Sequence, residues 1–219
     1  MKRYTTVLFD LDGTLLDTLG DLTASVNFSL QQHAFPTISA QDTRRFLGDG
    51  YAKLIERAIP EGASNPHFSR CLEEFAEHYN RNMMCHTKPY PGILDLLAEL
   101  KRKEYQMAVV SNKNNVAVKA LVEHYFGKYI QTAIGASAEI AHKPDPSSVH
   151  KALEELDANP NTTLYVGDSD VDILTARNAG LPCVCVSWGF RDKAFLEKNG
   201  APCIIDAPLD LLAVLAKVV

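Results

Sequence analysis

The stretch that decides the fold of this chain is TVLFDLDGT, residues 6–14. Its first four residues favour a β-strand and are mostly apolar, as in a buried strand. The strand pattern ends abruptly at two acids, Asp10 and Asp12, and the glycine that follows them predicts a turn. Two neighbouring carboxylates at the end of a strand repel each other and attract a cation. The stretch therefore predicts an acidic pair that takes part in chemistry.

Short apolar runs alternate with amphipathic segments over most of the remaining chain. We expect strands at residues 7–9, 107–110, 133–135, 164–166, 183–186 and 203–205, and helices at residues 93–100, 116–125, 147–156, 171–179, 193–199 and 209–218. Strands and helices that alternate with short loops predict an α/β fold with a doubly wound, mostly parallel, Rossmann-like sheet covered on both faces. Such folds have their active sites at the carboxyl ends of the strands. This edge matters here because Asp10, Ser111 and Asp168 each end an expected strand.

Residues 16–88 interrupt this alternation. No convincing strand pattern occurs there, and residues 21–32, 40–46, 51–58 and 67–82 favour helices that are separated by proline and glycine. We therefore expect a helical cap domain at residues 16–88, inserted after the first strand. The core catalytic domain is expected to comprise residues 1–15 and 89–219.

Composition restricts the range of partners. The 219 residues are 46% hydrophobic and 22% charged, which is typical of a globular protein, and the formal net charge is -5. Without a densely basic stretch, neither a nucleic acid nor an anionic membrane is expected as a partner. No apolar run approaches the roughly 18 residues of a membrane span, so we expect a cytoplasmic protein. The five cysteines form no Cys-x-x-Cys pair and are expected to be reduced thiols in the core.

Three further motifs carry polar groups at strand or helix ends. Ser111 ends a strand just before a helix, where a hydroxyl and backbone amides could cradle an anion, although serine is also a common helix cap. Lys143 stands on a turn stiffened by two prolines, an unusual place for a structural cation, although a surface lysine would also fit. Asp168 ends another strand and is followed by Asp170 and Asp172, although acids also suit the first turn of a helix.

Together, these motifs describe one site. Acids at the ends of two strands provide a hard, oxygen-rich pocket that suits Mg²⁺ better than zinc. A lysine and a hydroxyl at the same edge supply ligands for a phosphate. A carboxylate nucleophile beside a second carboxylate that transfers a proton is the minimum for covalent phosphoryl transfer. The motifs therefore indicate phosphoryl transfer.

The motifs occur in the order found in the haloacid dehalogenase-like phosphatase superfamily, which the chain resembles over essentially its whole length. The matching motifs are Asp-x-Asp-Gly-Thr at residues 10–14, Ser111, Lys143-Pro144 and Gly-Asp-x-x-x-Asp at residues 167–172. The resemblance implies that Asp10 attacks phosphorus and becomes an aspartyl-phosphate. It also implies that Asp12 protonates the leaving alcohol and then deprotonates the water that hydrolyses the intermediate.

The resemblance assigns the remaining site residues as well. The ligands of Mg²⁺ would be Asp10, the backbone carbonyl of Asp12, Asp168 and, as a ligand or just behind the ligands, Asp172. The residues that would bind the transferring phosphoryl group are Gly13, Thr14, Ser111, Asn112 and Lys143. The acid at position 12 favours a phosphatase over a dehalogenase or a phosphonatase, since the resemblance implies no acid there in either.

The helical insert resembles the cap of phosphoglycolate phosphatases, a subgroup of this superfamily. The similarity rests on Asp17-Thr18, Asp21-Leu22, Val26-Asn27 and the stretches 44–50 and 54–58. Leu19-Gly20 and Asp49 stand where many such enzymes have Ala-Pro and Asn, which leaves the substrate open. Arg44, Asp49 and Lys53 are candidate substrate contacts, although Arg44 and Lys53 would also fit a solvated helix face.

The resemblance and the motifs together predict a Mg²⁺-dependent phosphatase of small phosphorylated metabolites, a monomer or homodimer, with 2-phosphoglycolate as the leading candidate substrate. A phosphosugar mutase of the β-phosphoglucomutase type would use the same core residues, and an inorganic pyrophosphatase is a further alternative. A rival of another class is a non-enzymatic, receiver-like switch phosphorylated on Asp10. The inserted cap and the acid at Asp12, which would speed loss of the phosphoryl group, count against the switch.

Overall fold

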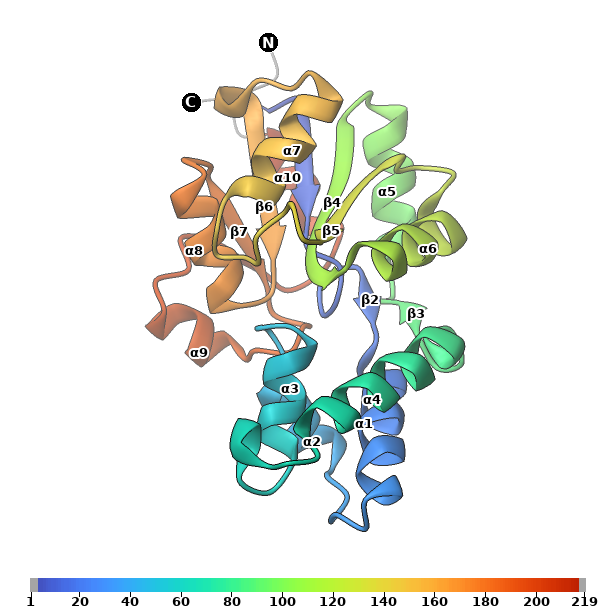
Figure 1. The fold of residues 1–219 in the computed structure, drawn as a ribbon. Helices are drawn as coiled ribbons and strands as arrows, with labels where there is room; N and C mark the ends of the chain where they lie inside the picture. Colours follow the sequence, from blue (N-terminus) through green and yellow to red (C-terminus); the bar gives the residue numbers. More distant parts are fainter. Residues whose placement is uncertain (1–3, 217–219) are drawn as a thin grey trace. The chain divides into compact units, whose positions relative to one another are not determined.

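The computed structural model describes residues 4–216, and these residues form two compact units (Figure 1). The core unit contains the described residues up to Leu16 and from Pro89 onward, and the cap unit contains Asp17–Lys88. The chain thus enters the cap unit soon after its first strand. It returns to the core unit before the next strand of the large sheet begins.

The core unit is built on one six-stranded sheet. Its strands are β1 (Thr6–Phe9), β4 (Gln106–Asn114), β5 (Thr132–Ala136), β6 (Thr163–Gly167), β7 (Cys183–Val186) and β8 (Ile204–Ile205). They lie in the order β5-β4-β1-β6-β7-β8, and every neighbouring pair is parallel. Along the chain, β4 and β5 are added on one side of β1, and β6, β7 and β8 are added on its other side. The end of β1 is therefore the topological switch point, where doubly wound folds bind their ligands.

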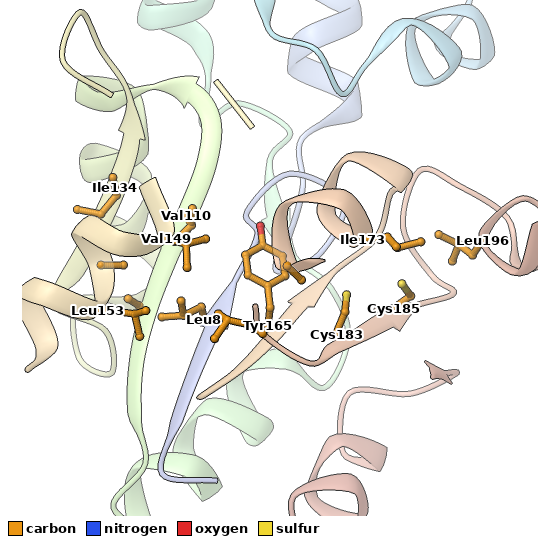
Figure 2. Close-up of a cluster of buried hydrophobic side chains, with 14 residues drawn as sticks. Leu8, Val110, Ile134, Val149, Leu153, Tyr165, Ile173, Cys183, Cys185 and Leu196 are labelled. Atoms are coloured by element: carbon orange, nitrogen blue, oxygen red, sulfur yellow. The ribbon is translucent and has the colours of Figure 1, made fainter. Parts of the chain in front are cut away.

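Helices cover this sheet on both faces. They are α5 (Ile93–Arg102), α6 (Asn115–Phe126), α7 (Ser147–Leu156), the 3-10 turn η2 (Pro160–Thr162), α8 (Asp170–Asn178), α9 (Lys193–Lys198) and α10 (Asp210–Ala216). On one face, alternate strand residues such as Leu8 and Tyr165 form a hydrophobic cluster (Figure 2). Val149 of α7 and Ile173 of α8 belong to the same cluster. The intervening strand residues are buried as well, so the other face is also covered.

The cap unit is largely helical. Its helices are α1 (Leu19–Gln32), α2 (Ala40–Phe46), α3 (Tyr51–Ala58), the 3-10 turn η1 (Gly62–Ser64) and α4 (Phe68–Asn82). α1 packs against α4 because each helix carries buried apolar residues at helical spacing. These residues are Leu22, Val26 and Leu30 on α1 and Cys71, Phe75 and Tyr79 on α4. The predicted fold class, a doubly wound parallel sheet with an inserted helical cap, is confirmed.

A short sheet occurs where no strand was expected. Leu16–Asp17 (β2) and Lys88–Pro89 (β3) form a two-stranded sheet at the two ends of the inserted segment. The expectation that residues 16–88 contain no strand was therefore wrong at these ends. Strands of two residues cannot show the alternating pattern, which becomes recognisable over roughly four residues or more.

The cysteines are all free thiols. Cys71, Cys183 and Cys185 are buried, and the last two point into the same cluster from β7, as their strand spacing predicted (Figure 2). Cys85 is exposed, so the prediction of a core thiol was wrong for this residue. It lies in a bend after α4, where helical spacing no longer governs burial. Within residues 4–216, no helix combines the length and the apolar character that a membrane crossing needs.

Candidate active site

The parallel register brings the ends of three strands level with one another. Phe9 of β1 is paired with Val109 of β4 and with Val166 of β6. The backbone N–H that follows Phe9 donates to the carbonyl of Val166 at 2.8 Å. Because the carboxyl ends of parallel strands lie at one edge of the sheet, the polar residues that follow these strands meet there. Asp10 and Asp168 directly follow β1 and β6. Ser111 was expected to end its strand, but it lies within β4, which continues to Asn114.

The turn after β1 depends on Gly13. This residue has a φ of +88°, in the left-handed region that favours glycine. A Cβ at this position would also collide with the carboxylate of Asp168. The next residue, Thr14, donates its hydroxyl to Oδ2 of Asp10 at 3.4 Å. The Gly-Thr pair therefore packs the turn closely against two of the site's carboxylates.

Three buried carboxylates form the acidic centre of the site. One oxygen each of Asp10, Asp168 and Asp172 lies within 4.8 Å of the other two. Burial raises the pKa of Asp10 from 3.8 to about 7, although Lys143 opposes the rise. Burial and the charge of Asp172 also raise the pKa of Asp168 well above its usual range. A hard divalent cation would relieve the cost of holding these charges together, so the three residues fit Mg²⁺.

Gly189 and Phe190, in the segment after β7, lie against Asp168. The backbone N–H of Phe190 donates to Oδ2 of Asp168 at 2.6 Å. A Cβ at Gly189 would overlap with the side chain of Asp168, so glycine is required for this close approach. The indole N–H of Trp188 donates to the carbonyl of Thr14 at 3.0 Å. This segment therefore fixes both Asp168 and the turn that follows β1.

Lys143 is a buried cation between two of the carboxylates. Its Nζ lies 2.6 Å from Oδ1 of Asp10 and 2.7 Å from Oδ1 of Asp172. The same ammonium group donates to the hydroxyl of Tyr165 at 3.1 Å and to the carbonyl of Val110 at 3.3 Å. Burial acts to lower the pKa of Lys143, but the charges of Asp10 and Asp172 raise it well above its usual value. Lys143 therefore stays charged and offsets part of the negative charge of the site.

Asn112 anchors the loop that carries Lys143. Its side-chain amide donates to the carbonyl of Lys143 at 3.0 Å, and its side-chain oxygen accepts from the backbone N–H of Lys143 at 2.6 Å. This two-way contact ties the end of β4 to the loop before α7. The resemblance assigned Asn112 to the phosphoryl group, and that role stays a prediction. What the structure adds is that the Asn112 side chain contacts the main chain of Lys143.

Asp172 is held through both of its oxygens. Oδ1 contacts Lys143 and accepts from the hydroxyl of Tyr165 at 3.0 Å. Oδ2 accepts from the hydroxyl of Ser169 at 2.6 Å and from the backbone N–H of Asp168 at 3.2 Å. Ser169 and Asp172 also form the capping box that begins α8. Burial would raise the pKa of Asp172, but Lys143 and these hydrogen bonds lower it, so the residue stays ionised.

Asp12 has a partner that the sequence pattern did not predict. Nζ of Lys113 lies 2.6 Å from Oδ1 of Asp12. The Lys113 side chain is 1% exposed and that of Asp12 is 18% exposed, so the acid is the more accessible member of the pair. The backbone N–H of Lys113 donates to the hydroxyl of Ser111 at 3.2 Å. The end of β4 thus supplies both a hydroxyl and a second buried cation.

The three cap candidates lie in the cap unit. Oδ2 of Asp49 lies 2.6 Å from Nη2 of Arg57, and Oε2 of Glu56 lies 2.7 Å from Nζ of Lys53. Arg44 lies in the last turn of α2. The assignment of Arg44, Asp49 and Lys53 to the substrate stays a prediction.

Several residues of the site were not predicted from the sequence: Lys113, Tyr165, Ser169, Trp188, Gly189 and Phe190. Lys113 lies two residues after Ser111 in β4, but the register of β4 shifts after Val110, so simple alternation does not predict the direction of its side chain. Tyr165 gives no signal either, because a tyrosine within an apolar strand resembles any core aromatic residue. Phe190 contributes its backbone N–H, which leaves no trace in the side-chain pattern.

Comparison with known proteins links most of the chain to one family of sequences. Residues 7–186 match the family model described as haloacid dehalogenase-like hydrolase. Phosphoglycolate phosphatase 1 of Pseudomonas aeruginosa is 32% identical over 212 residues, which cover 94% of this chain and 78% of that protein. The phosphoglycolate phosphatase of Mesorhizobium japonicum is 33% identical over 195 residues, which cover 87% of this chain and 86% of that protein.

Solved structures share the fold. A crystal structure of a candidate phosphoglycolate phosphatase from Lactobacillus delbrueckii subsp. bulgaricus has a TM-score of 0.93 at 35% identity, covering 99% of this chain and 100% of that chain. CbbY from Rhodobacter sphaeroides, solved in complex with phosphate, has a TM-score of 0.79 at 26% identity, covering 99% of this chain and 100% of that chain. The similarity therefore includes the helical insert as well as the core sheet.

Proposed function

The chain belongs to the haloacid dehalogenase-like hydrolase family and is a phosphatase. We propose that it hydrolyses small phosphorylated metabolites through an aspartyl-phosphate on Asp10. The substrate best supported is 2-phosphoglycolate, since both relatives named above are phosphoglycolate phosphatases. The observation that carries the proposal concerns the Asp10 carboxylate at the carboxyl edge of the sheet: it belongs to a buried acidic cluster with Asp168 and Asp172 and lies 2.6 Å from the buried Lys143.

The first step would transfer the phosphoryl group to Asp10. An oxygen of Asp10 forms a bond to phosphorus while the bond from phosphorus to the leaving oxygen breaks. Oδ1 is held by Lys143 at 2.6 Å, whereas Oδ2 accepts a longer hydrogen bond of 3.4 Å from Thr14, which favours Oδ2 as the attacking atom. Asp12 gives its proton to the leaving alcohol oxygen. Lys143 and Ser111 would bind the oxygens of the transferring group.

Water completes the reaction in the second step. Asp12, now a carboxylate, removes a proton from a water molecule as the water oxygen attacks phosphorus and the bond to Asp10 breaks. Inorganic phosphate leaves, and Asp10 returns to its carboxylate form. Nζ of Lys113, 2.6 Å from Oδ1 of Asp12, would hold the Asp12 carboxylate in place between the two steps.

Mg²⁺ is part of the proposal. The side chains of Asp10 and Asp168 and the backbone carbonyl of Asp12 would hold the ion. An oxygen of Asp172 lies within 4.8 Å of the Asp10 and Asp168 carboxylates. Oδ1 of Asp172 already contacts Lys143 and Tyr165, and Oδ2 contacts Ser169. These contacts favour a role for Asp172 in positioning the other groups rather than in binding the ion directly. When bound, the ion would neutralise negative charge that a phosphate dianion otherwise meets among the carboxylates.

The remaining expectations complete the proposal. Gly13 and Asn112 would help to bind the phosphoryl group at the strand ends. Arg44, Asp49 and Lys53 of the cap unit would contact the rest of the substrate and so select it. The protein would act in the cytoplasm, as a monomer or a homodimer.

A screen of phosphorylated metabolites tests the proposal. Phosphate release is measured from 2-phosphoglycolate, sugar phosphates, pyrophosphate and p-nitrophenyl phosphate, with Mg²⁺ or with a chelator. We expect release that requires Mg²⁺ and is fastest with 2-phosphoglycolate. Asp10→Asn should abolish it, and the matched control Asp95→Asn, which changes an exposed acid of α5, should leave it unchanged. Turnover retained in Asp10→Asn, or transfer to a second sugar hydroxyl instead of water, would refute the proposal.

A further inference from the structure

Tyr165 is a core residue with one polar atom at the edge of the core. It lies in the middle of β6, and its side chain is fully buried at 0% exposure. Its ring belongs to the hydrophobic cluster that covers one face of the sheet. Figure 2 shows the ring near Leu8, with the hydroxyl oxygen pointing away from the side chains of Leu8 and Cys183. The hydroxyl is therefore directed out of the apolar cluster, toward Lys143 and Asp172 of the site.

The hydroxyl lies between two charged groups of the site. It accepts from Nζ of Lys143 at 3.1 Å and donates to Oδ1 of Asp172 at 3.0 Å. This direction is fixed, because an ammonium group has no acceptor and an ionised carboxylate has no donor. Burial raises the pKa of Tyr165 well above its usual value, so the phenol keeps its proton. The two-step reaction described above does not otherwise use this group.

Lys143 needs contacts that persist when Asp10 reacts. Once Asp10 forms its bond to phosphorus, the negative charge on that carboxylate is lost, and the ammonium group gains phosphoryl oxygens as partners. Tyr165 and Asp172 take no part in bond formation and stay as they are. We propose that Tyr165 is a positioning residue, whose hydroxyl, together with Asp172, keeps the ammonium group of Lys143 at the strand edge during phosphoryl transfer. This inference rests on the proposed function.

If Tyr165 had only a structural role, phenylalanine would serve equally well at this position. Phenylalanine fills the same apolar volume and avoids burying a hydroxyl, which costs free energy unless new hydrogen bonds replace those to water. Without the hydroxyl, the three protons of the Lys143 ammonium group still have three acceptors: Asp10, Asp172 and the carbonyl of Val110. Lys143 therefore stays paired in Tyr165→Phe. The substitution tests the position of the cation rather than its charge.

The test is the kinetics of Tyr165→Phe with p-nitrophenyl phosphate and Mg²⁺. The hydrogen bonds of the hydroxyl to Lys143 and to Asp172 are both lost, while the other contacts of Lys143 remain. We therefore expect kcat to fall roughly tenfold with KM nearly unchanged. The matched control is Tyr79→Phe, which removes the hydroxyl of a fully buried tyrosine in α4 of the cap unit. Its kcat should equal that of the wild type. An unchanged kcat in Tyr165→Phe, or an equal loss in Tyr79→Phe, overturns the proposal.

A double-mutant cycle tests whether Tyr165 acts through Lys143. In a Lys143→Arg background, Tyr165→Phe should change kcat by less than about twofold, because the group that the hydroxyl positions is already altered. The same loss in both backgrounds would show that Tyr165 acts independently, and the proposal would fail. Turnover retained in Asp10→Asn would remove the proposed function itself. Inactive Asp10→Asn with normal kcat in Tyr165→Phe would remove only the role of Tyr165.

Discussion

Asp10→Asn should make the metal-free protein more stable although it abolishes turnover. Burial raises the pKa of Asp10 from 3.8 to about 7, so the folded protein binds this proton more tightly than the unfolded chain does. Ionised Asp10 therefore costs folding free energy. The cost is absent while both states are protonated, grows as the pH rises from about 4 to 7, and is complete above that range. Asparagine keeps the shape of the protonated side chain and avoids the cost.

The change in pKa sets the size of the effect. Each pKa unit corresponds to about 1.4 kcal/mol, so the rise from 3.8 to about 7 corresponds to about 4 kcal/mol at pH 8. At pH 5, where folded Asp10 is mostly protonated, the cost falls below about 2 kcal/mol. In a protein of this length, about 1 kcal/mol shifts Tm by 2–4 °C, so Asp10→Asn should gain roughly 10 °C at pH 8.

Thermal unfolding in the presence of a chelator measures this difference at pH 5 and at pH 8. We expect the Tm of Asp10→Asn to exceed that of the wild type at pH 8 and the gap to narrow at pH 5. Asp95→Asn, the exposed control, should match the wild type at both pH values. A less stable Asp10→Asn at pH 8, or a gap that does not change with pH, would show that the crowded carboxylates carry no folding cost.

Substitutions at three further positions test individual parts of the site. Lys113→Met should lower kcat by about tenfold or more, because Asp12 loses its cation at 2.6 Å, and Lys113→Arg should recover part of the loss in steady-state assays. Gly189→Ala should raise the Mg²⁺ concentration needed for half-maximal activity, because the added Cβ collides with Asp168. Asn112→Ala should lower kcat/KM several-fold, roughly, because the Lys143 loop loses two hydrogen bonds.

The sheet and its active edge could be predicted because the local patterns agree with each other. In the six-stranded sheet, β1, β4, β5 and β6 each contain one of the short apolar runs. The expected helix at residues 147–156 has the same bounds as α7, Ser147–Leu156. The carboxyl ends of parallel strands share one edge, so Asp10 and Asp168, which directly follow β1 and β6, are brought together by topology alone. The type of residue at each strand end then indicates a metal and phosphate site.

Contacts within that edge could not be predicted in the same way. Nothing in the spacing of Lys113 and Lys143 shows which carboxylate each one pairs with. The register between β4 and β5 shifts after Val110, so side-chain directions beyond that residue do not follow from simple alternation. The two-way contact of Asn112 also depends on the path of the Lys143 loop. These details require coordinates.

Asp10 is proposed to carry the phosphoryl group during turnover, and this can be observed directly. The reaction is quenched in acid within the first turnover at saturating substrate, and the peptide that contains residues 6–14 is examined by mass spectrometry. We expect a phosphoryl group on Asp10 in the wild type and none in Asp10→Asn. Phosphate release without a phosphorylated Asp10, or a phosphoryl group on another residue, would contradict this claim.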